Sequence, residues 1–427
     1  EIVSLAGGSP YVSALPLDAV GEMIGRLVAD HGEVALQYCT AQGDTGLREK
    51  ICDVMALEEI RAHPDEIVVT VGSQQALDLM ARIFIDPGDV ILVEAPSYVG
   101  ALGAFASYQA QVVHVAMDDD GLIPEALEEA IRRTAAAGRK AKFLYTVPNF
   151  HNPAGVTLAA GRRPRILDIC QRAGLLVVED NPYGLLGFDA DPMRALRADD
   201  DEGVVYLGTF SKVLAPGLRL GWAVAPRPVL EKLNLCKQGI DLCSPSVTQM
   251  FVAAYFRERA PGGGALWEQY VGRLRTLYRA RRDAMFEALE ESFGEQATWT
   301  TPEGGMFLWV TLDRRIDTTD LLALARKREA VAFVPGRAAY VDGKRGSSSM
   351  RLNFAGTAEA EIREAVARIG RAAREQLGLL GSLTGTRERP TAAAAPKPAP
   401  AAEEPLADVV ELPRREGEKP SRRRRDA

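Results

Sequence analysis

The feature that most constrains the fold is an alternation of short apolar runs with helical patterns between about residues 46 and 250. The apolar runs predict seven strands, at residues 66–72, 89–96, 111–117, 142–148, 175–183, 204–210 and 219–225. The helical patterns lie at residues 46–60, 73–84, 100–109, 124–137 and 162–174. Strands that are apolar on both faces, with helices between them, indicate a mainly parallel seven-stranded sheet covered on both faces. The fold class is therefore predicted as α/β.

A second, smaller α/β domain is predicted downstream. Its strands lie at residues 304–312, 330–336 and 349–355, and its helices at 265–293, 318–328 and 357–377. The predicted organisation is an N-terminal arm rich in Gly and Pro, a large domain that holds the main sheet, a C-terminal small domain and a tail, over residues 1–40, 41–260, 261–382 and 383–427. The arm is expected to contribute to the small domain. The tail is rich in Ala, Pro and charge and lacks aromatic residues, so we expect it to be disordered.

Composition excludes several classes of function. A formal net charge of -7 argues against a general nucleic-acid surface. The five cysteines form no CxxC pair and have no zinc spacing with a histidine, so no metal site is expected and the protein is predicted to be cytoplasmic, with reduced thiols. No apolar run approaches the roughly 18 residues that a membrane span needs. The expected partners are small molecules and other subunits.

Polar residues follow several of the predicted strands. Asn152 follows the strand at 142–148, Asp180 and Tyr183 end the next strand, and Lys212 follows the strand at 204–210. Tyr98 comes just after the strand at 89–96. Because parallel strands end at the same edge of a sheet, these side chains are expected to meet there.

An anion site is predicted beside them. The segment VTVGSQQALD runs from a strand into a helix, which places the backbone N–H groups of Gly72, Ser73 and Gln74 at a helix N-terminus. Arg219 and the hydroxyl groups of Thr209 and Ser211 would complete this site.

These residue types together predict an aldehyde cofactor that carries a phosphate and a pyridine ring. Lys212 would condense with the aldehyde, and Asp180 would keep the ring nitrogen protonated. Asn152 and Tyr183 would bond the ring oxygen, and Tyr98 would stack on the ring. Arg351 is the natural bidentate partner for a substrate α-carboxylate. Each residue alone has a structural alternative, such as a helix cap, a packing residue or a salt bridge, and their order along successive strand ends favours the site.

At this point the chain resembles the class I/II family of pyridoxal-phosphate-dependent aminotransferases, the fold type I group, from about Ser4 to about Leu380. The matching motifs are YCTAQGDTGLR (38–48), TVGSQQALD (70–78), PSYVG (96–100), PNFHNPAG (148–155), VVEDNPY (177–183), TFSKVLAPGLRLGW (209–222) and MRLNFA (350–355). The opening SLAGGSP and the form PGLRLGW are most similar to the branch of 2-aminoadipate, kynurenine and multi-substrate aminotransferases.

The resemblance implies a role for each site residue. Lys212, Asp180 and Tyr98 would be catalytic, and the cofactor, pyridoxal 5'-phosphate (PLP), would be bound by these three together with Ser73, Gln74, Asn152, Tyr183, Thr209, Ser211, Arg219 and Tyr38. Substrate would contact Gly8, Tyr38, Asn152 and Arg351. In this family the tyrosine that matches Tyr38 reaches the phosphate in the neighbouring subunit, which implies a homodimer with shared active sites.

The sequence departs from the family's usual spelling in two places. His151 stands where many relatives have Gln, and Ala154 stands where they have Thr. His151 is interpreted either as a residue that modifies the pocket or as a structural loop histidine. The arm between Gly8 and Leu17, which helps to select the substrate in this branch, is also spelled unusually.

The predicted activity is transfer of an amino group from an L-amino acid to a 2-oxo acid, with 2-oxoglutarate as the expected acceptor, by a ping-pong mechanism. This corresponds to an enzyme of EC 2.6.1 type. Two alternatives stay open from the sequence. One is another PLP reaction on the same fold, such as that of a β-lyase or a decarboxylase. The other is the aminotransferase-like domain of a GntR-type transcription regulator.

Overall fold

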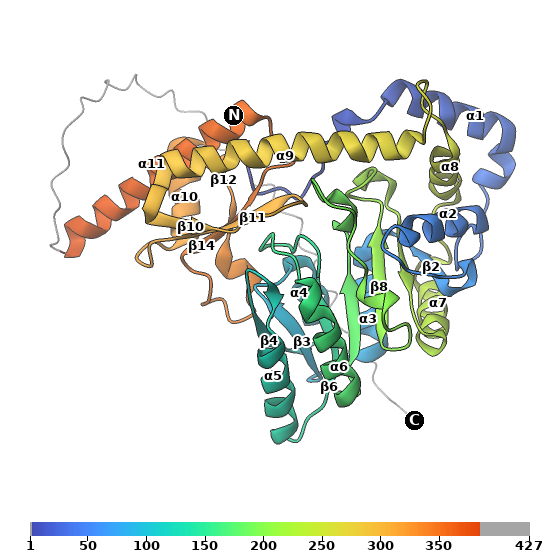
Figure 1. The fold of residues 1–427 in the computed structure, drawn as a ribbon, viewed down its shortest axis with the longest axis horizontal. Coiled ribbons are helices and arrows are strands. Elements are labelled where there is room, and N and C mark those ends of the chain that lie inside the picture. Colours follow the sequence, from blue (N-terminus) through green and yellow to red (C-terminus); the bar gives the residue numbers. More distant parts are fainter. Residues whose placement is uncertain (1, 385–427) are drawn as a thin grey trace, which may run out of the picture.

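A computed structural model of the protein describes residues 2–384. Its centre is an eight-stranded sheet with helices on both faces (Figure 1). Its strand order is β2-β9-β8-β7-β6-β3-β4-β5. The strands are β2 Ile67–Thr70, β3 Val90–Ala95, β4 Gln111–Asp118, β5 Gly121–Leu122, β6 Ala141–Thr146, β7 Leu176–Asp180, β8 Val204–Thr209 and β9 Gly221–Val224. The predicted α/β class is confirmed, and all seven predicted strands are present.

The sheet is mixed and has one strand more than the predicted seven. Strands β3, β4, β6, β7 and β8 run parallel, whereas β9 is antiparallel to both of its neighbours, β2 and β8. The additional strand is β5, which pairs with β4 because the chain reverses at residues 119–120, directly before Gly121, a residue with φ +84°. A two-residue strand gives too short a pattern to predict from the sequence.

Alternate residues of the central strands face different helices. On β3, Ile91 and Val93 belong to the core that includes α3 (Gly72–Phe84), α4 (Val99–Ser107) and α7 (Arg227–Asp241). Val90 and Leu92 belong to a second core with α5 (Pro124–Ala136) and α6 (Arg163–Ala173). Burial on both faces explains why these strands appear as continuous apolar runs in the sequence.

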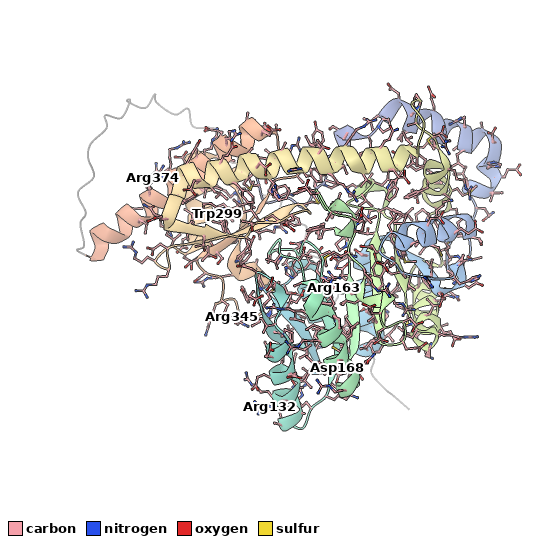
Figure 2. All side chains as sticks on the ribbon, in the orientation of Figure 1. Arg132, Arg163, Asp168, Trp299, Arg345 and Arg374 are labelled. Carbon is pink, nitrogen blue, oxygen red and sulfur yellow. The ribbon has the colours of Figure 1, made fainter. Side chains whose placement is uncertain are left out.

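The outer surfaces of the covering helices are charged. Arg132 on α5 and Asp168 on α6 project from the molecule (Figure 2), with side chains that are 77% and 64% exposed. Both helices are therefore amphipathic, with the apolar stripe on the sheet.

A second, four-stranded antiparallel sheet has the order β10-β11-β14-β13. Its strands are β10 Ala297–Trp299, β11 Phe307–Leu312, β14 Ser349–Asn353 and β13 Val334–Pro335, and the helices of this region are α9 Leu266–Phe293, α10 Thr318–Glu329 and α11 Glu359–Thr384. Helix α9 runs along one side of the molecule, from α11 to α8 (Ser246–Arg257) (Figure 1).

The strand predicted at 330–336 is in fact two short strands. Val331–Ala332 forms β12, which pairs in parallel with β1 (Val3–Ser4), while Val334–Pro335 pairs with β14. Phe333 lies between them and is buried. The prediction of one strand was wrong because the two halves pair with different partners.

The N-terminal arm contains a long helix, α1 (Leu17–Ala35), which the sequence analysis did not predict. Met23, Leu27 and Ala35 form its buried face, and α1 lies beside α8 (Figure 1). Three glycines lower its intrinsic helix propensity. Tertiary packing, which no local pattern reports, accounts for this helix.

The remaining elements are short or begin with clear capping signals. Helix α2 (Thr45–Ala56) begins after Asp44, whose side chain accepts a hydrogen bond from the Leu47 amide. Short 3-10 helices lie at Val12–Ala14, Pro64–Glu66, Ala160–Arg162, Gly184–Leu186, Leu196–Ala198, Pro216–Leu218, Gly294–Gln296 and Gly336–Ala339.

The predicted division at residues 40, 260 and 382 stays a prediction. Helix α11 continues to Thr384, past its predicted end at Leu377, and the predicted tail lies outside the described residues from position 385 onward. None of the helices described between residues 2 and 384 combines the length and apolarity needed to cross a membrane.

Candidate active site

A cavity of about 340 Å³ opens at the carboxyl edge of the central sheet. It is lined by residues that follow β2, β3, β6, β7 and β8, together with residues from the arm and from the small sheet. Of the predicted site residues, the structure brings the following together around this cavity: Gly8, Ser73, Gln74, Tyr98, Asn152, Asp180, Tyr183, Thr209, Ser211, Lys212, Arg219 and Arg351.

Lys212 lies in the turn after β8 and is held toward the arm. Its Nζ donates a hydrogen bond to the Gly8 carbonyl at 2.7 Å. Burial lowers the pKa of Lys212 to about 8, and the guanidinium groups of Arg351 and Arg219 act in the same direction, against the opposing effect of Asp180. A lysine in this environment yields a neutral, nucleophilic amine more readily than an exposed lysine does.

Asp180 is the last residue of β7 and is 3% exposed. One carboxylate oxygen, Oδ2, accepts a hydrogen bond from the Tyr145 hydroxyl at 2.8 Å, while Oδ1 is buried without a hydrogen-bond partner. Burial raises the pKa of Asp180 to about 6, although Tyr145 and Lys212 act in the opposite direction. A buried, unsatisfied carboxylate oxygen at the base of a cavity is a site for a donor from a ligand.

Arg351 reaches the cavity from β14 of the small sheet. It is 7% exposed, and its guanidinium donates to Asn152 Oδ1 at 2.9 Å and to the Ala6 carbonyl at 2.5 Å. The guanidinium carbon lies 4.3 Å from the centre of the Phe307 ring, and Nε has no hydrogen-bond partner. Burial lowers the pKa of Arg351. A buried cation with unused donors is suited to binding a carboxylate.

Asn152 connects this cation to the aromatic wall of the cavity. Its Nδ2 donates to the Tyr183 hydroxyl at 3.3 Å. Tyr183 in turn packs edge-on against Phe307, with ring centres 5.7 Å apart. Burial raises the pKa of Tyr183, so its hydroxyl keeps its proton.

The predicted anion site is a compact turn between β2 and α3. The N-cap residue of α3 is Val71, which has no side chain that can cap the helix, so the first N–H groups of α3 point toward the cavity end of the helix. Gly72 has φ +72°, and a methyl group there would lie 2.5 Å from Arg219 Nη2. A methyl group on Gly221 would lie 2.6 Å from the Ser73 nitrogen. Both glycines are required for this close approach.

Hydroxyl groups and a guanidinium lie beside this turn. Together with the N-terminus of α3 they form what we call the anion corner. Thr209 Oγ1 lies within hydrogen-bond distance of Ser211 Oγ, at 3.0 Å, and accepts from the Ser211 amide at 3.1 Å. Arg219, with φ +52°, donates to the carbonyl groups of Pro216 and Val71. The corner therefore gathers positive charge and donors, as an anion site needs.

Tyr98 begins α4 and forms one wall of the cavity. Its hydroxyl donates to Gln74 Oε1 at a long distance of 3.4 Å. Burial raises the pKa of Tyr98, and the nearby Asp180 raises it as well. The ring is thus placed beside the anion corner in its neutral form.

Tyr38 is the predicted site residue that the structure does not bring to this cavity. It is 75% exposed and follows other exposed apolar side chains, Val34 and Leu36, at the end of α1. Within the described chain Tyr38 does not line the cavity.

His151 is a buried loop residue rather than a pocket residue. It is 1% exposed and does not line the cavity. Its Nε2 lies 3.1 Å from Glu94 Oε2, and its Nδ1 accepts from the Ala154 amide at 3.2 Å. These contacts favour the structural interpretation of His151 over a direct effect on the pocket.

Sequence reasoning missed several residues that line the cavity, among them Tyr145 and Phe307. Tyr145 lies in β6 and pairs with Val178 of β7, so its closeness to Asp180 depends on the register between these two strands. Phe307 comes from the small sheet. A polar aromatic residue inside an apolar strand was the only local signal for Tyr145.

Comparison with known proteins places the chain in a family. The family described as "Aminotransferase class I and II" matches residues 2–369. The aromatic-amino-acid aminotransferase 1 of Thermococcus litoralis is 42% identical over 88% of this chain and 89% of its own length.

Among the described residues, no group of three or more His, Cys, Asp or Glu side chains is arranged to hold a metal ion.

Two solved structures are similar in fold as well as in sequence. The Pyrococcus horikoshii kynurenine aminotransferase has a TM-score of 0.82 and 40% identity, over 88% of this chain and 91% of that chain. The α-aminoadipate aminotransferase of Thermus thermophilus, in complex with N-(5'-phosphopyridoxyl)-L-leucine, has a TM-score of 0.82 and 37% identity, over 88% and 93%. The chain thus belongs to the class I and II aminotransferase family and is a PLP-dependent enzyme that transfers amino groups.

Proposed function

We propose that the cavity binds PLP and carries out a ping-pong transfer between an amino acid and a 2-oxo acid. The observation that carries the proposal is the buried, unpartnered Oδ1 of Asp180, opposite Lys212 in one cavity. A protonated ring nitrogen is the donor that this oxygen lacks. When bound, PLP supplies an aldehyde for an amine and a ring that withdraws electrons from the substrate Cα.

The residues of the cavity fit the cofactor at both of its ends. The α3 N-terminus with Ser73, Gln74, Thr209, Ser211 and Arg219 would hold the phosphate. Asn152 and Tyr183 would bond the ring oxygen, and Tyr98 would lie on the ring. Each of these groups has donors or an aromatic face directed to the same 340 Å³ cavity.

Lys212 would act twice in each half of the cycle. Its amine would hold the cofactor in the resting enzyme. Once released by the incoming amino group, it would take the proton from the substrate Cα and deliver it to the carbon that came from the cofactor's aldehyde. The lowered pKa of about 8 supports this role, since an amine near its pKa both accepts and donates protons. The carbonyl of Gly8 would orient the released amine.

Arg351 would bind the substrate α-carboxylate. Its current hydrogen bonds to Asn152 and Ala6 keep the guanidinium at the cavity wall, and the unpartnered Nε remains for a ligand. Gly8 and Asn152 would line the same substrate position.

We propose that the amino donor has a large, uncharged side chain and that 2-oxoglutarate is the acceptor. Tyr98, Val99 and Phe307 supply apolar surface. The name of the Thermococcus litoralis relative, an aromatic-amino-acid aminotransferase, supports this donor class.

We also propose a homodimer with shared sites. Tyr38 is exposed, as are apolar residues of α1 and of the α7 end, among them Ile24, Val28, Leu235, Ile240 and Leu242. A partner subunit that covers this surface would receive Tyr38 at its anion corner, where the phosphate is proposed to bind.

Initial rates with different donors test the substrate proposal. Phenylalanine, leucine, 2-aminoadipate and aspartate would each be supplied with 2-oxoglutarate, and glutamate formation measured. We expect phenylalanine to be used faster than aspartate, because Tyr98, Val99 and Phe307 offer apolar surface to its ring. A preference for aspartate would contradict the donor class, and ammonia or carbon dioxide as the main product would favour a β-lyase or a decarboxylase.

A further inference from the structure

The turn that forms the anion corner is braced from inside the protein. The Val71 amide, at the N-cap of α3, donates to Gln75 Oε1 at 2.8 Å. The Thr70 hydroxyl donates to the Gly72 carbonyl at 2.9 Å. The direction of the first free N–H groups of α3 thus depends on the side chain of Gln75.

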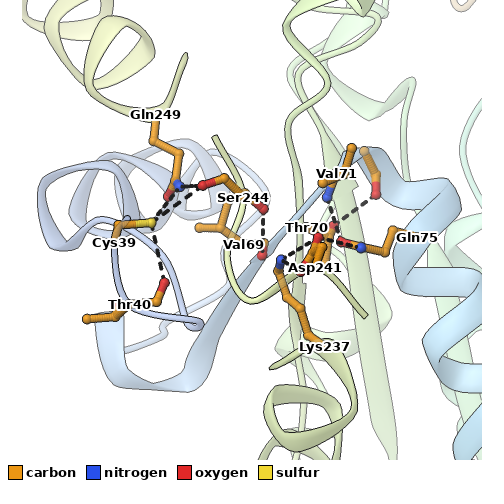
Figure 3. Close-up of polar contacts among 11 residues, drawn as sticks. Cys39, Thr40, Val69, Thr70, Val71, Gln75, Lys237, Asp241, Ser244 and Gln249 are labelled. Carbon is orange, nitrogen blue, oxygen red and sulfur yellow. Dashed lines mark hydrogen bonds and ion pairs between the residues drawn. The ribbon is translucent and has the colours of Figure 1, made fainter. Parts of the chain in front are cut away.

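Gln75 is itself held by a half-buried carboxylate at the end of α7. Its Nε2 donates to Asp241 Oδ2 at 2.7 Å. Because a carboxylate can only accept and the Val71 amide can only donate, these two partners allow a single orientation of the Gln75 amide. Figure 3 shows Gln75 between Val71 and Asp241.

The charge of Asp241 is balanced by a lysine one turn earlier. Lys237 is 0% exposed, and its Nζ lies 2.7 and 2.9 Å from the two carboxylate oxygens of Asp241. The Asp241 side chain is 22% exposed, so the pair is partly buried, and the Lys237 ammonium depends on it for charge compensation. Neither residue lines the cavity, and neither belongs to any motif that suggested the site.

The same α7–α8 corner also holds the segment that carries Tyr38. Ser244 Oγ donates to the Val69 carbonyl on β2, at 3.3 Å. Gln249 Nε2 donates to the Ser244 carbonyl at 2.8 Å and to Cys39 Sγ at 3.2 Å (Figure 3). The corner therefore fixes the α3 turn on one side and the neighbours of Tyr38 on the other.

We propose that Lys237, Asp241 and Gln75 are positioning residues that hold the α3 turn in the geometry that binds the cofactor phosphate. This inference rests on the proposed PLP site. The three residues act through the backbone of Val71, Gly72 and Ser73 and do not touch the cofactor. Their contribution is selective for the phosphate, because the ring and the aldehyde are held by other strand ends.

Gln75→Met tests this selectivity, because it removes both amide hydrogen bonds but leaves the Lys237–Asp241 pair intact. The cofactor-free variant would be titrated with PLP and with pyridoxal, which lacks the phosphate. We expect PLP affinity to fall by about tenfold, the size of one lost hydrogen bond, and pyridoxal affinity to stay unchanged. Asp241→Asn should act in the same direction.

Tyr108→Phe is the matched control. The Tyr108 hydroxyl donates to Asp78 Oδ1 at 3.0 Å, so this variant also removes a hydrogen bond to α3, but farther along the helix. It should leave both affinities unchanged. Amide hydrogen exchange of the cofactor-free proteins gives a second measurement: exchange at Val71 to Gln74 should speed up in Gln75→Met and not in Tyr108→Phe.

Two outcomes would overturn the inference. One is a Gln75→Met variant with native PLP affinity and native exchange at the turn, and the other is an equal loss of PLP and pyridoxal affinity. If the unmodified protein bound no PLP, the proposed function would fail instead, and the exchange measurement would still show whether the α7 pair braces the turn.

Discussion

At the residue scale, the chemistry of the site depends on two ionisable groups whose pKa values are displaced toward each other. Burial lowers the pKa of Lys212 to about 8 and raises the pKa of Asp180 to about 6. Burial is the main cause of both shifts, and at Lys212 the guanidinium groups of Arg351 and Arg219 add to it, so the pKa values follow from where the fold places the two groups. In the proposed function, Asp180 would accept a hydrogen bond from the ring nitrogen of PLP, and Lys212 would react with its aldehyde.

The Asp180 carboxyl makes a prediction about the cofactor-free protein. Its folded pKa, about 6, lies above the usual value of about 3.9, so the folded state binds the extra proton and stability falls as pH rises through this window. Asp180→Asn removes this titration. We expect the variant to be more stable than the unmodified protein at pH 8, by up to about 3 kcal/mol, and equally stable below pH 4.

Denaturant unfolding of both cofactor-free proteins across pH measures this difference. A stability difference that does not vary with pH would contradict the assignment. With PLP present the order should reverse, because the neutral amide of the variant cannot keep the ring nitrogen protonated.

A site residue could be predicted from the sequence only where its position shows in a local sequence pattern. Lys212 and Asp180 follow apolar runs, so their place at a strand end is a local fact. Tyr145 and Phe307 enter the cavity through strand register and through the small sheet, and neither relation leaves a local pattern. Lys237 and Asp241 were missed for the same reason, since their partner Gln75 is 166 residues from Asp241.

At the element scale, the decisive feature is the turn from β2 into α3. Gly72 holds φ +72° and leaves room for Arg219. Gly72→Ala would introduce both backbone strain and a clash with the guanidinium. We expect PLP affinity to fall by about tenfold or more, since the strain alone costs about 1 to 2 kcal/mol.

Gly103→Ala is the control for this substitution. Gly103 lies in α4, where a methyl group would meet nothing within 4 Å. The control should bind PLP normally and unfold at the same or a slightly higher temperature. Equal PLP affinity in Gly72→Ala and Gly103→Ala would show that the turn geometry is not what binds the phosphate.

Helices and strands were predicted well where their burial leaves a pattern of apolar residues in the sequence. A strand buried on both faces leaves a continuous apolar run, and a helix buried along one stripe leaves a helical period. All seven long strands of the central sheet were predicted on that basis. Helix α1 was not, because its glycines weaken the local signal and its stability comes from packing on α8. The split of residues 331–335 between two sheets was equally beyond local reasoning, since it depends on where β1 returns.

At the scale of the whole molecule, the arm, the central sheet and the small sheet meet at one cavity. Gly8 comes from the arm, Lys212 from the large sheet and Arg351 from the small sheet. Tyr38, of the predicted site residues, is exposed and does not line this cavity. The homodimer proposed above would bring the Tyr38 of a second copy to it.

Subunit mixing tests the shared site. Tyr38→Ala and Lys212→Ala should each be impaired, the first in phosphate binding and the second in chemistry. After the two variants exchange subunits, a mixed dimer has one site with both native residues, so part of the activity should return. Activity that stays at the sum of the two variants would contradict sharing.

Amino transfer at Lys212 is the central claim, and an isotope experiment measures it directly. The protein would be given ¹⁵N-labelled phenylalanine and 2-oxoglutarate, and the nitrogen in the glutamate formed would be analysed by mass spectrometry. The account predicts ¹⁵N-glutamate from the unmodified protein and none from Lys212→Ala. Glutamate labelled to the same extent by Lys212→Ala, or no labelled amino acid from the unmodified protein with any acceptor, would contradict it.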